Sequence, residues 1–281
     1  MTGADNFNIY SDFPWANIRI VLVETSHPGN IGAVARAMKN MQLESLYLVK
    51  PQHPPDRHSA ARSSGATDVL NQAVICSSLA EAISDCRLVI AASARLRSIP
   101  WPTADATEAA RKLVMNCQQA PVALVFGRED RGLNNEELDH CNLMTRLPAN
   151  PDFSSLNIAA AVQVFSYEIR KAYLALVGQH QTADDSVDKI SRRVPDSDRP
   201  VSSQNLINLF NHFEETLVQV HFMPEHRTQT LMRKLKRFFN KSQITEEEVS
   251  IFRGILTELQ RLSTLHDELK IASNNRDVTE K

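Results

Sequence analysis

The chain has 281 residues with 31 basic and 33 acidic side chains, which gives a formal net charge of −2. This balance excludes a polycation that holds nucleic acid by bulk charge, so any RNA contact must come from a local basic patch. The hydrophobic content of 42% is enough to bury a core in one large or two modest domains. Four cysteines without a CxxC pair, no signal-peptide pattern and no apolar run of about 18 residues predict a cytoplasmic protein without a membrane span.

From residue 18 to about residue 177 the chain alternates short apolar runs with helical patterns, which is typical of an α/β domain built on a parallel sheet. Runs rich in Val, Ile and Leu indicate strands covered on both faces at 19–23, 45–49, 87–91 and 122–126, with a weaker one at 143–147. Apolar residues at helical spacing predict helices at 31–41, 80–85, 104–116 and 156–176.

The composition changes after this domain. Residues 178–200 are polar and contain two prolines, which predicts an exposed linker. Helical patterns follow at 203–222, 228–240 and 245–271, the last opened by a capping box from Thr245 to Glu248. The predicted parts are a flexible N-terminus at 1–17, an α/β domain at 18–177, a linker at 178–200, a helical extension at 201–272 and a frayed tail at 273–281.

The usual nucleotide fingerprints are absent, since the sequence has no P-loop, no G-x-G-x-x-G after its first strand and no G-x-S-x-G elbow. Polar segments instead follow three of the predicted strands, and the carboxyl ends of strands are where open α/β sheets bind ligands. These segments are ETSHPGNIGAVAR at 24–36, FGREDRGL at 126–133 and LPANPDFSSLN at 147–157.

Each polar segment also has a purely structural interpretation. In the first, Asn30 is expected to cap a helix whose free N–H groups face a ligand, or the segment is only a tight turn with a solvent-facing arginine. The second is either a charged turn held by ion pairs or a loop in which Gly127 lets a ligand approach the backbone. In the third, Ser154 or Ser155 serves simply as the N-cap of the long helix that follows.

Taken together and in this order, HPGNIGAVARA, ALVFGREDRGL and LPANPDFSSLNIAAAV resemble the three motifs of a known family. This family is the SpoU/TrmH branch of the SPOUT superfamily of S-adenosylmethionine-dependent RNA 2′-O-methyltransferases. The resemblance covers the domain at 18–177 and implies a parallel sheet whose C-terminal segment is threaded into a trefoil knot, an exception to unknotted connectivity. It also implies a homodimer with the knot helices at the interface.

The resemblance places S-adenosylmethionine in the knot. By position in the matching motifs, the residues that bind it are Ala92, Ser93, Ala94, Gly127, Leu147, Ser154, Ser155 and Leu156. These positions combine small side chains with loop backbone, which suits an adenine ring that packs on apolar surface and bonds to backbone groups.

The catalytic residues implied by the resemblance are Arg36, Asn30, Glu129 and Ser155. The difficulty of the reaction lies in a ribose hydroxyl that is a poor nucleophile at neutral pH. Arg36 acts on it either as a base or as a charged group that holds phosphate and stabilises the alkoxide, and its reference pKa of about 12.5 or more makes a literal base unusual. Asn30 and Glu129 orient Arg36 or the ribose, or Glu129 only fixes its loop in an ion pair. This chemistry requires no metal, and no metal-ligand cluster is visible.

RNA binding is expected from a basic segment near the C-terminus. Its basic residues, with no acid between them, are Arg227, Arg233, Lys234, Lys236, Arg237 and Lys241. Leu235, Phe238 and Phe239 are expected to anchor the apolar side of this helix while the charges contact phosphates. The alternatives are a solvated helical face and a role of the extension in reinforcing a dimer.

The segment SARLRSIPWP and the helical extension resemble those family members that methylate the ribose of cytidine or uridine at position 32 in the anticodon loop of tRNA. The sequence therefore predicts a tRNA methyltransferase with tRNA as its partner. The alternatives are a ribosomal RNA 2′-O-methyltransferase and a catalytically silent RNA-binding knot protein.

Overall fold

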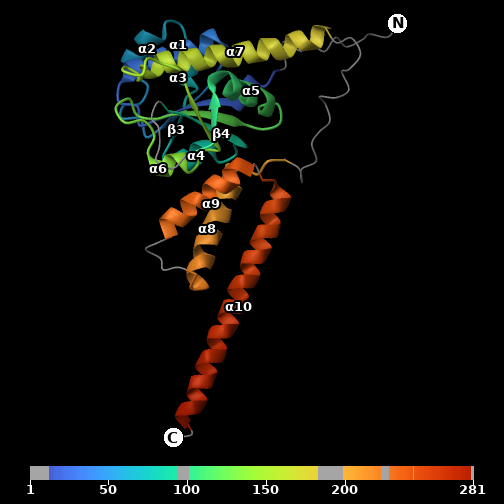
Figure 1. Cartoon of the computed structure of the whole chain (residues 1–281). Coiled ribbons are helices and arrows are strands. Elements are labelled where there is room, and N and C mark those ends of the chain that lie inside the picture. The colour runs from blue at the N-terminus through green and yellow to red at the C-terminus, as the bar shows by residue number, and fades with distance from the viewer. Residues whose placement is uncertain (1–12, 94–100, 183–198, 223–227, 243, 280–281) are drawn as a thin grey trace, which may run out of the picture. The chain divides into compact units, whose positions relative to one another are not determined.

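The computed structural model describes residues 13–93, 101–182, 199–222, 228–242 and 244–279. The chain forms two compact units, of residues 1–193 and 194–281 (Figure 1). Most of the predicted linker, residues 183–198, lies outside the described residues. The predicted domain bounds at 18–177 and 201–272 stay predictions.

The first unit contains one sheet of seven strands in the order β3-β2-β1-β6-β4-β7-β5, and all of its strand pairs are parallel. The strands are β1 (Ile18–Val23), β2 (Ser45–Val49), β3 (Val74–Cys76), β4 (Leu88–Ala92), β5 (Thr103–Asp105), β6 (Val122–Phe126) and β7 (Leu143–Arg146). The predicted parallel α/β fold is confirmed, because the apolar runs form central strands such as β1 and β6 that are buried throughout. The short edge strands β3 and β5 were not predicted, since three residues carry too little pattern.

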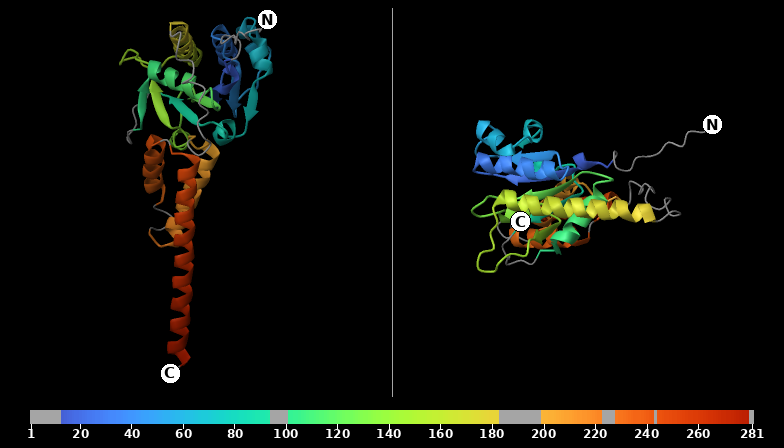
Figure 2. Two further views of the ribbon diagram at one scale, coloured as in Figure 1. Left: turned by 90° about the vertical axis from the view of Figure 1, so that its right-hand side faces the viewer. Right: turned by 90° about the horizontal axis from the view of Figure 1, so that it is seen from above.

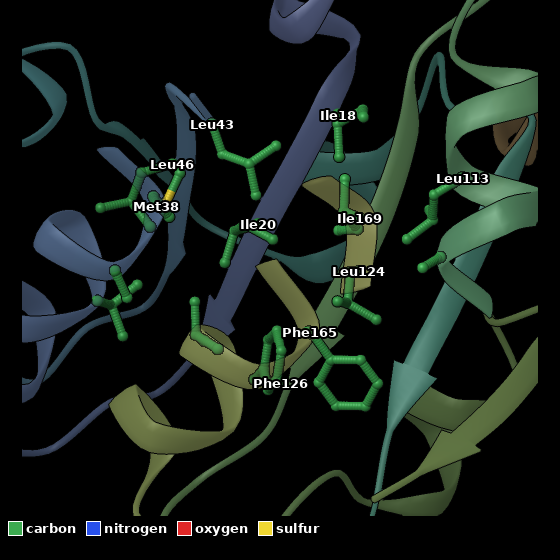
Figure 3. Close-up of a cluster of buried hydrophobic side chains, with 14 of the residues drawn as sticks. Ile18, Ile20, Met38, Leu43, Leu46, Leu113, Leu124, Phe126, Phe165 and Ile169 are labelled. Atoms are coloured by element: carbon green, nitrogen blue, oxygen red, sulfur yellow. The ribbon is translucent and has the colours of Figure 1, made fainter. Parts of the chain in front are cut away.

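Helices cover both faces of this sheet, and residues of each strand alternate between two cores. The helices are α1 (Pro28–Asn40), α2 (Arg57–Ser63), α3 (Thr67–Asn71), α4 (Leu79–Ile83), α5 (Ala106–Asn116), α6 (Asn135–Leu138) and α7 (Ile158–Thr182), after a short 3-10 turn at Trp15–Asn17. Ile20 of β1 joins Met38 of α1 and Ile169 of α7 in the larger core (Figure 3). Val21 points to the other face, where α4 and α6 pack.

Helix α1 lies beside α7 on the larger core (Figure 2). The start of α1 corrects one prediction, because it begins at Pro28 and its N-cap is His27, whose Nδ1 accepts from the Gly29 N–H at 3.0 Å. Asn30 therefore lies within the first turn, and its prediction as the N-cap was wrong. Proline favours the first helical position, where its missing N–H costs nothing.

Helix α7 begins later and ends later than predicted. Neither Ser154 nor Ser155 is its N-cap, because the helix starts at Ile158 and the Asn157 side chain accepts from the Ala159 N–H at 2.9 Å. Its backbone continues to Thr182, so the beginning of the predicted linker is helical. The predicted knot concerns the threading of the backbone around this region and stays a prediction.

The second unit consists of α8 (Ser203–Gln219), α9 (Thr228–Ser242) and α10 (Glu246–Thr279). Its core includes Leu209, Phe210 and Phe239. The predicted capping box is confirmed, since the Thr245 N–H donates to Glu248 at 2.8 Å and the Glu248 N–H donates to Thr245 Oγ1 at 3.3 Å. The tail predicted as frayed is helical to Thr279, because no glycine or proline after Gly254 stops α10.

Candidate active site

The predicted site residues lie at one edge of the sheet. Strands β1, β6, β4 and β7 are neighbours and parallel, so their carboxyl ends lie side by side. The end of β4 and the loops after β6 and β7 line a cavity of about 220 Å³. This edge is the position at which open parallel sheets bind ligands.

The cavity brings together all but one of the residues predicted to bind the cofactor. Those that line it are Ala92, Ser93, Gly127, Leu147, Ser154, Ser155 and Leu156. The remaining one, Ala94, lies outside the described residues. Phe126, Ile158, Ala161 and Phe165 add apolar surface, so the lining is suited to a planar apolar ring as well as to polar groups.

Three features of this lining fit S-adenosylmethionine, a nucleoside with a positively charged sulfur. A Cβ on Gly127 would lie 2.2 Å from Leu133 N, so only glycine lets the loop fold back against its own end. Thr145 Oγ1 is buried against the cavity and has no hydrogen-bond partner among the described residues, which leaves it able to bond a ligand. The same cavity is lined by two carboxylates, Glu129 and Asp130, and by two guanidiniums, Arg128 and Arg131. Asp130 pairs with Arg131, and Arg128 pairs with Glu24 and Glu137, so Glu129 is the carboxylate of the lining that favours a positive ligand.

Glu129 connects the loop after β6 to the start of α1. One carboxylate oxygen accepts from Asn30 Nδ2 at 2.9 Å, and the other accepts from the N–H and the Oγ of Ser26, each at 3.2 Å. Asn157 extends the chain of bonds, since its Nδ2 donates to Asn30 Oδ1 at 3.1 Å. Desolvation raises the pKa of Glu129, but these hydrogen bonds outweigh it and hold the pKa below its usual value. The carboxylate is therefore ionised at neutral pH, and its partners are hydrogen-bond donors rather than a basic side chain.

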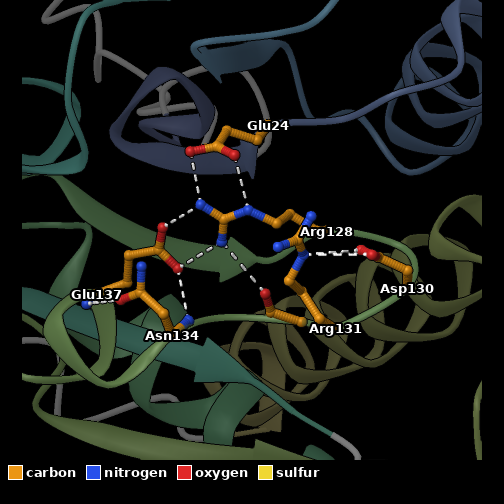
Figure 4. A network of polar contacts seen from close by, with 7 residues as sticks. Glu24, Arg128, Asp130, Arg131, Asn134 and Glu137 are labelled. Atoms are coloured by element: carbon orange, nitrogen blue, oxygen red, sulfur yellow. Dashed lines mark hydrogen bonds and ion pairs between the residues drawn. The ribbon is translucent and has the colours of Figure 1, made fainter.

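The neighbouring Arg128 holds the same loop through ion pairs (Figure 4). Its guanidinium lies 2.6 Å from a Glu24 carboxylate oxygen at the end of β1 and 2.9 Å from one of Glu137 in α6. Its side chain is only 10% exposed, and Arg128 Nη1 also donates to the Gly132 carbonyl at 3.4 Å. Both carboxylates raise the pKa of Arg128, and the hydrogen bond from Arg128 lowers the pKa of Glu24. The segment is thus a charged turn held by ion pairs, and it also lines the cavity, whereas the approach of a ligand at Gly127 stays a prediction.

Arg36, the predicted actor on the ribose, does not belong to this cavity. It is exposed on α1, and its Nη1 donates to Ser64 Oγ at 3.2 Å. Arg36 follows Asn30 by six residues, about 240° around the helix axis, so the two side chains leave α1 in different directions. The structure brings Asn30, Glu129 and Ser155 to the cavity edge and leaves Arg36 apart from them.

Several residues of the site were not singled out from the sequence. Asn157 and Thr145 fall in or beside the third motif, Glu24 opens the first polar segment, and Glu137 follows the second. The Asn134–Glu137 pair was visible as a capping-box pattern, which the structure confirms with bonds of 2.7 and 2.8 Å. No sequence signal could pair Glu24 with Arg128, because the two are 104 residues apart.

The basic segment forms α9. Lys234 and Lys241 are exposed, Arg233, Lys236 and Arg237 are half-buried, and Arg227 lies outside the described residues. Phe239 is buried, but Phe238 is 63% exposed, so its prediction as a core anchor was wrong. Phe238 contacts Phe239 edge-on with ring centroids 5.4 Å apart, which leaves an aromatic surface among the positive charges.

Within the described ranges, no helix is long and apolar enough to cross a membrane. Among the same residues, no group of three or more His, Cys, Asp or Glu side chains is placed to hold a metal ion.

A parallel α/β unit with a ligand cavity at the carboxyl edge of its sheet defines the class as an α/β enzyme. Residues 17–167 match the SpoU rRNA Methylase family, and residues 204–268 match the C-terminal domain of the tRNA methyltransferase TrmJ. The chain belongs to the SpoU methylase family, and the resemblance of its three motifs is thereby confirmed.

Similar proteins match both units. The tRNA (cytidine/uridine/adenosine-2′-O-)-methyltransferase TrmJ of Pseudomonas aeruginosa UCBPP-PA14 is 44% identical over 247 residues, 88% of this chain and 95% of the relative. TrmJ of Klebsiella pneumoniae is 44% identical over 245 residues, 87% of this chain and 97% of the relative. The crystal structure of TrmJ from Z. mobilis ZM4 matches with a TM-score of 0.71 and 30% identity over 86% of this chain and 98% of that one. A probable methylase of Haemophilus influenzae Rd KW20 matches with a TM-score of 0.57 and 39% identity over 90% and 99%.

Proposed function

We propose that this protein transfers a methyl group from S-adenosylmethionine to the ribose 2′-hydroxyl of cytidine or uridine at position 32 of tRNA. The observation that carries the proposal is the match of 87% to 88% of the chain to tRNA 2′-O-methyltransferases together with the cavity lined by the end of β4 and by the second and third motifs. The tRNA substrate also agrees with a reaction in the cytoplasm.

The cavity supplies the cofactor site of this proposal. Ala92, Gly127 and Leu147 surround the nucleoside, and the unpartnered Thr145 hydroxyl offers a bond to it. S-adenosylmethionine supplies a methyl group on a positively charged sulfur. Glu129, ionised and fixed by Asn30 and Ser26, stabilises positive charge at the cavity edge and orients the ribose.

Arg36 remains charged in the proposed mechanism. A guanidinium holds the phosphate beside the target nucleotide and stabilises the oxygen of the ribose as its proton leaves to water or a neighbouring group. Its exposure on α1, apart from the cavity of its own chain, is consistent with a homodimer in which each site draws residues from both copies. The outer face of α7, with Tyr167 53% and Leu174 50% exposed, is apolar enough to form such an interface.

The RNA contact in this proposal is α9. Exposed Lys234 and Lys241 reach phosphates, and Phe238 is placed to stack on an unpaired base. Replacing Lys234, Lys236 and Arg237 by glutamine therefore weakens tRNA binding and flattens its dependence on salt. Glutamines at Arg111 and Lys112 of α5 are the matched control, and an equal salt slope in both variants would contradict the contact.

The decisive experiment incubates the full chain with methyl-labelled S-adenosylmethionine and tRNA from a strain that lacks the activity, followed by mapping of the methylated nucleotide. The expected product is a 2′-O-methyl group at position 32. Transfer to ribosomal RNA alone would establish the alternative substrate, and normal cofactor binding without transfer would leave a silent RNA-binding protein.

An Arg36→Ala variant separates catalysis from cofactor binding. The expected result is unchanged affinity for S-adenosylmethionine, measured by calorimetry, and turnover reduced at least about a hundredfold, as for other removed electrostatic contacts. Arg111→Ala on α5 is the control and keeps both properties. Equal loss of affinity and turnover in Arg36→Ala would make the residue structural.

A further inference from the structure

Helix α10 has one face that packs inside its own unit. Leu256 is 4% exposed, and Gln260 Oε1 lies 3.2 Å from His212 Nε2 of α8. Ser263 Oγ donates to the Gln219 carbonyl at the end of α8 at 3.0 Å. These contacts fix which side of α10 faces α8.

A neighbouring face carries a stripe of exposed aliphatic side chains. The members of this apolar stripe, with their exposed fractions, are Ile251 (58%), Ile255 (52%), Leu259 (43%), Leu262 (50%), Leu265 (42%) and Leu269 (70%). At about 100° per residue these positions fall on one side of the helix, and Ser263 and Leu256 lie about 100° to 120° around the helix axis from Leu262. Nothing within the described part of the second unit covers the stripe.

The stripe also continues beyond the support that α8 provides. The last described hydrogen bonds between α10 and α8 reach Ser263 and Thr264, and His221, just after α8, lies 4.0 Å from a carboxylate oxygen of Asp267, whereas α10 runs on to Thr279 (Figure 1). A helical segment without packing is marginal in water, and most helical stability in proteins comes from burial of an apolar face. The stripe is therefore the surface whose burial would stabilise the distal part of α10.

The spacing of the stripe is symmetric about Leu262. Leu259 and Leu265 lie three residues to either side of it, and Ile255 and Leu269 lie seven residues to either side. A two-fold interface pairs residue i with residue j and j with i. An antiparallel second α10 with Leu262 on the axis thus pairs Ile255 with Leu269 and Leu259 with Leu265, so five of the six stripe residues meet an apolar partner, and Ile251 at the end of the stripe faces Ser273.

Charge distinguishes the antiparallel from the parallel arrangement. Glu258 and His266 lie four residues to either side of Leu262 and border the stripe. In the antiparallel pair each Glu258 faces the His266 of the other copy, where a ring N–H can donate to the carboxylate. In a parallel pair in register, Glu258 would face Glu258, and like charges at such a position are unfavourable. Glu258 also pairs with Arg261 of its own helix at 2.6 Å, outside the symmetric core of the stripe.

We propose that the apolar stripe of α10 is a self-association surface that pairs antiparallel with the stripe of a second copy of this chain, with Leu262 at the two-fold axis. We infer a second copy as the partner because the stripe reads alike in both directions from Leu262. When two copies run antiparallel, aliphatic residues therefore meet aliphatic residues and Glu258 meets His266. The contact is independent of the proposed methyl transfer and of any interface formed by α7.

Cysteine cross-linking of the full-length protein tests the pairing. The natural thiols of Cys76, Cys86, Cys117 and Cys141 are buried, so new surface cysteines react selectively. Mixing Ile255→Cys protein with Leu269→Cys protein under mild oxidation is expected to give the mixed disulfide at least tenfold faster than either variant links to itself. Thr257→Cys, exposed and about 200° around the helix from Ile255, is the control and links no faster than free diffusion allows.

A second variant checks that the apolar stripe itself drives the contact. Leu262→Asp, placed in the Ile255→Cys and Leu269→Cys proteins, is expected to abolish the mixed disulfide, whereas Thr257→Asp leaves it intact. Preferred linking of Ile255→Cys to itself would mean a parallel pair and overturn the proposal. Disulfide formation no faster than in the control would overturn the proposal as well. In that case, slow reaction of a Leu262→Cys thiol with a thiol-labelling reagent would mean that another part of the same chain covers the stripe.

Discussion

Two loops line the same cavity and are held in very different ways. The loop after β6 is closed by Arg128, which joins it to Glu24 and Glu137 and is almost buried. The loop after β7, residues 147–157, is exposed from residue 150 onward, and Phe153 is 77% exposed. Its described bonds are mostly local, such as the one from the Phe153 N–H to the Asn150 carbonyl at 3.0 Å.

We expect the loop after β6 to stay rigid and the loop after β7 to change its conformation when ligands bind. A wall fixed by ion pairs holds Glu129 at a constant distance from Asn30 before any ligand arrives, and such preorganisation lowers the cost of binding. An exposed loop with few tertiary contacts can adjust around the cofactor and the RNA. Ser154 and Ser155 belong to the exposed loop, and Asn157 caps α7 because it is the residue directly before the first helical residue, Ile158.

The largest effect on stability is expected from removing the ion pairs of Arg128 that hold the loop after β6. Arg128→Ala leaves the Glu24 and Glu137 carboxylates without their cation, and we expect a loss of about 2 to 3 kcal/mol in the free energy of unfolding of the first unit. This is below the roughly 3 to 5 kcal/mol typical of fully buried pairs, because Glu24 is 38% exposed. Denaturant titration followed by tryptophan fluorescence measures it, since both tryptophans, Trp15 and Trp101, lie in this unit.

Arg131→Ala is the matched control for this prediction. Arg131 belongs to the same loop, but its ion pair with Asp130 is 69% exposed on both sides. Exposed pairs contribute about 0 to 1 kcal/mol, so this variant is expected to stay near the natural stability. Equal losses in the free energy of unfolding for the two variants would mean that the buried ion pairs of Arg128 stabilise the loop no more than an exposed pair does.

The next largest effect is expected on cofactor affinity when the backbone of the loop after β6 is forced to shift. Gly127→Ala places a Cβ 2.2 Å from backbone atoms of Gly132 and Leu133, and we expect affinity for S-adenosylmethionine to fall about tenfold because the loop must shift. Gly132→Ala meets no atom within 4 Å, although its φ of +68° makes it strained by about 1 kcal/mol. It should therefore lower stability slightly and change affinity less than twofold, and calorimetric titration of both variants decides the matter.

The smallest effect is the pH dependence of the stability that the Glu24–Arg128 ion pair contributes. The hydrogen bond from Arg128 lowers the pKa of Glu24 from 4.5, so its stabilising contribution is complete above about pH 4.5 and is lost as the pH falls through the lower folded value. Glu24→Gln is expected to lower Tm at pH 7 by roughly 2 to 4 °C, the equivalent of about 1 kcal/mol. The difference in Tm from the natural protein should close progressively as the pH falls below 4.5, whereas Glu136→Gln at an exposed position should show no difference at any pH.

The sequence predicted the parallel α/β fold and the loops that form the cavity because both depend on local pattern. The strands at 45–49 and 122–126 were predicted with their observed bounds, since a strand buried on both faces is a continuous apolar run. The cavity-lining position of Gly127 followed from a polar segment directly after such a strand, and that of Leu147 followed from the resemblance of the third motif to the family. Short elements such as α2, α3 and α6 were missed, because a helix of four to seven residues shows hardly one period.

The amino-acid sequence by itself determined which segments are strands, which loops reach the carboxyl edge of the sheet and which family the motifs resemble. Only the tertiary structure decided that Arg128 pairs with Glu24 across 104 residues, that Asn157 bonds to Asn30 across 127, and that Arg36 stands apart from the cavity. The physical reason is that burial follows a periodic pattern along the chain, whereas a hydrogen bond or ion pair depends on the distance between segments, which is set when the sheet and its helices pack.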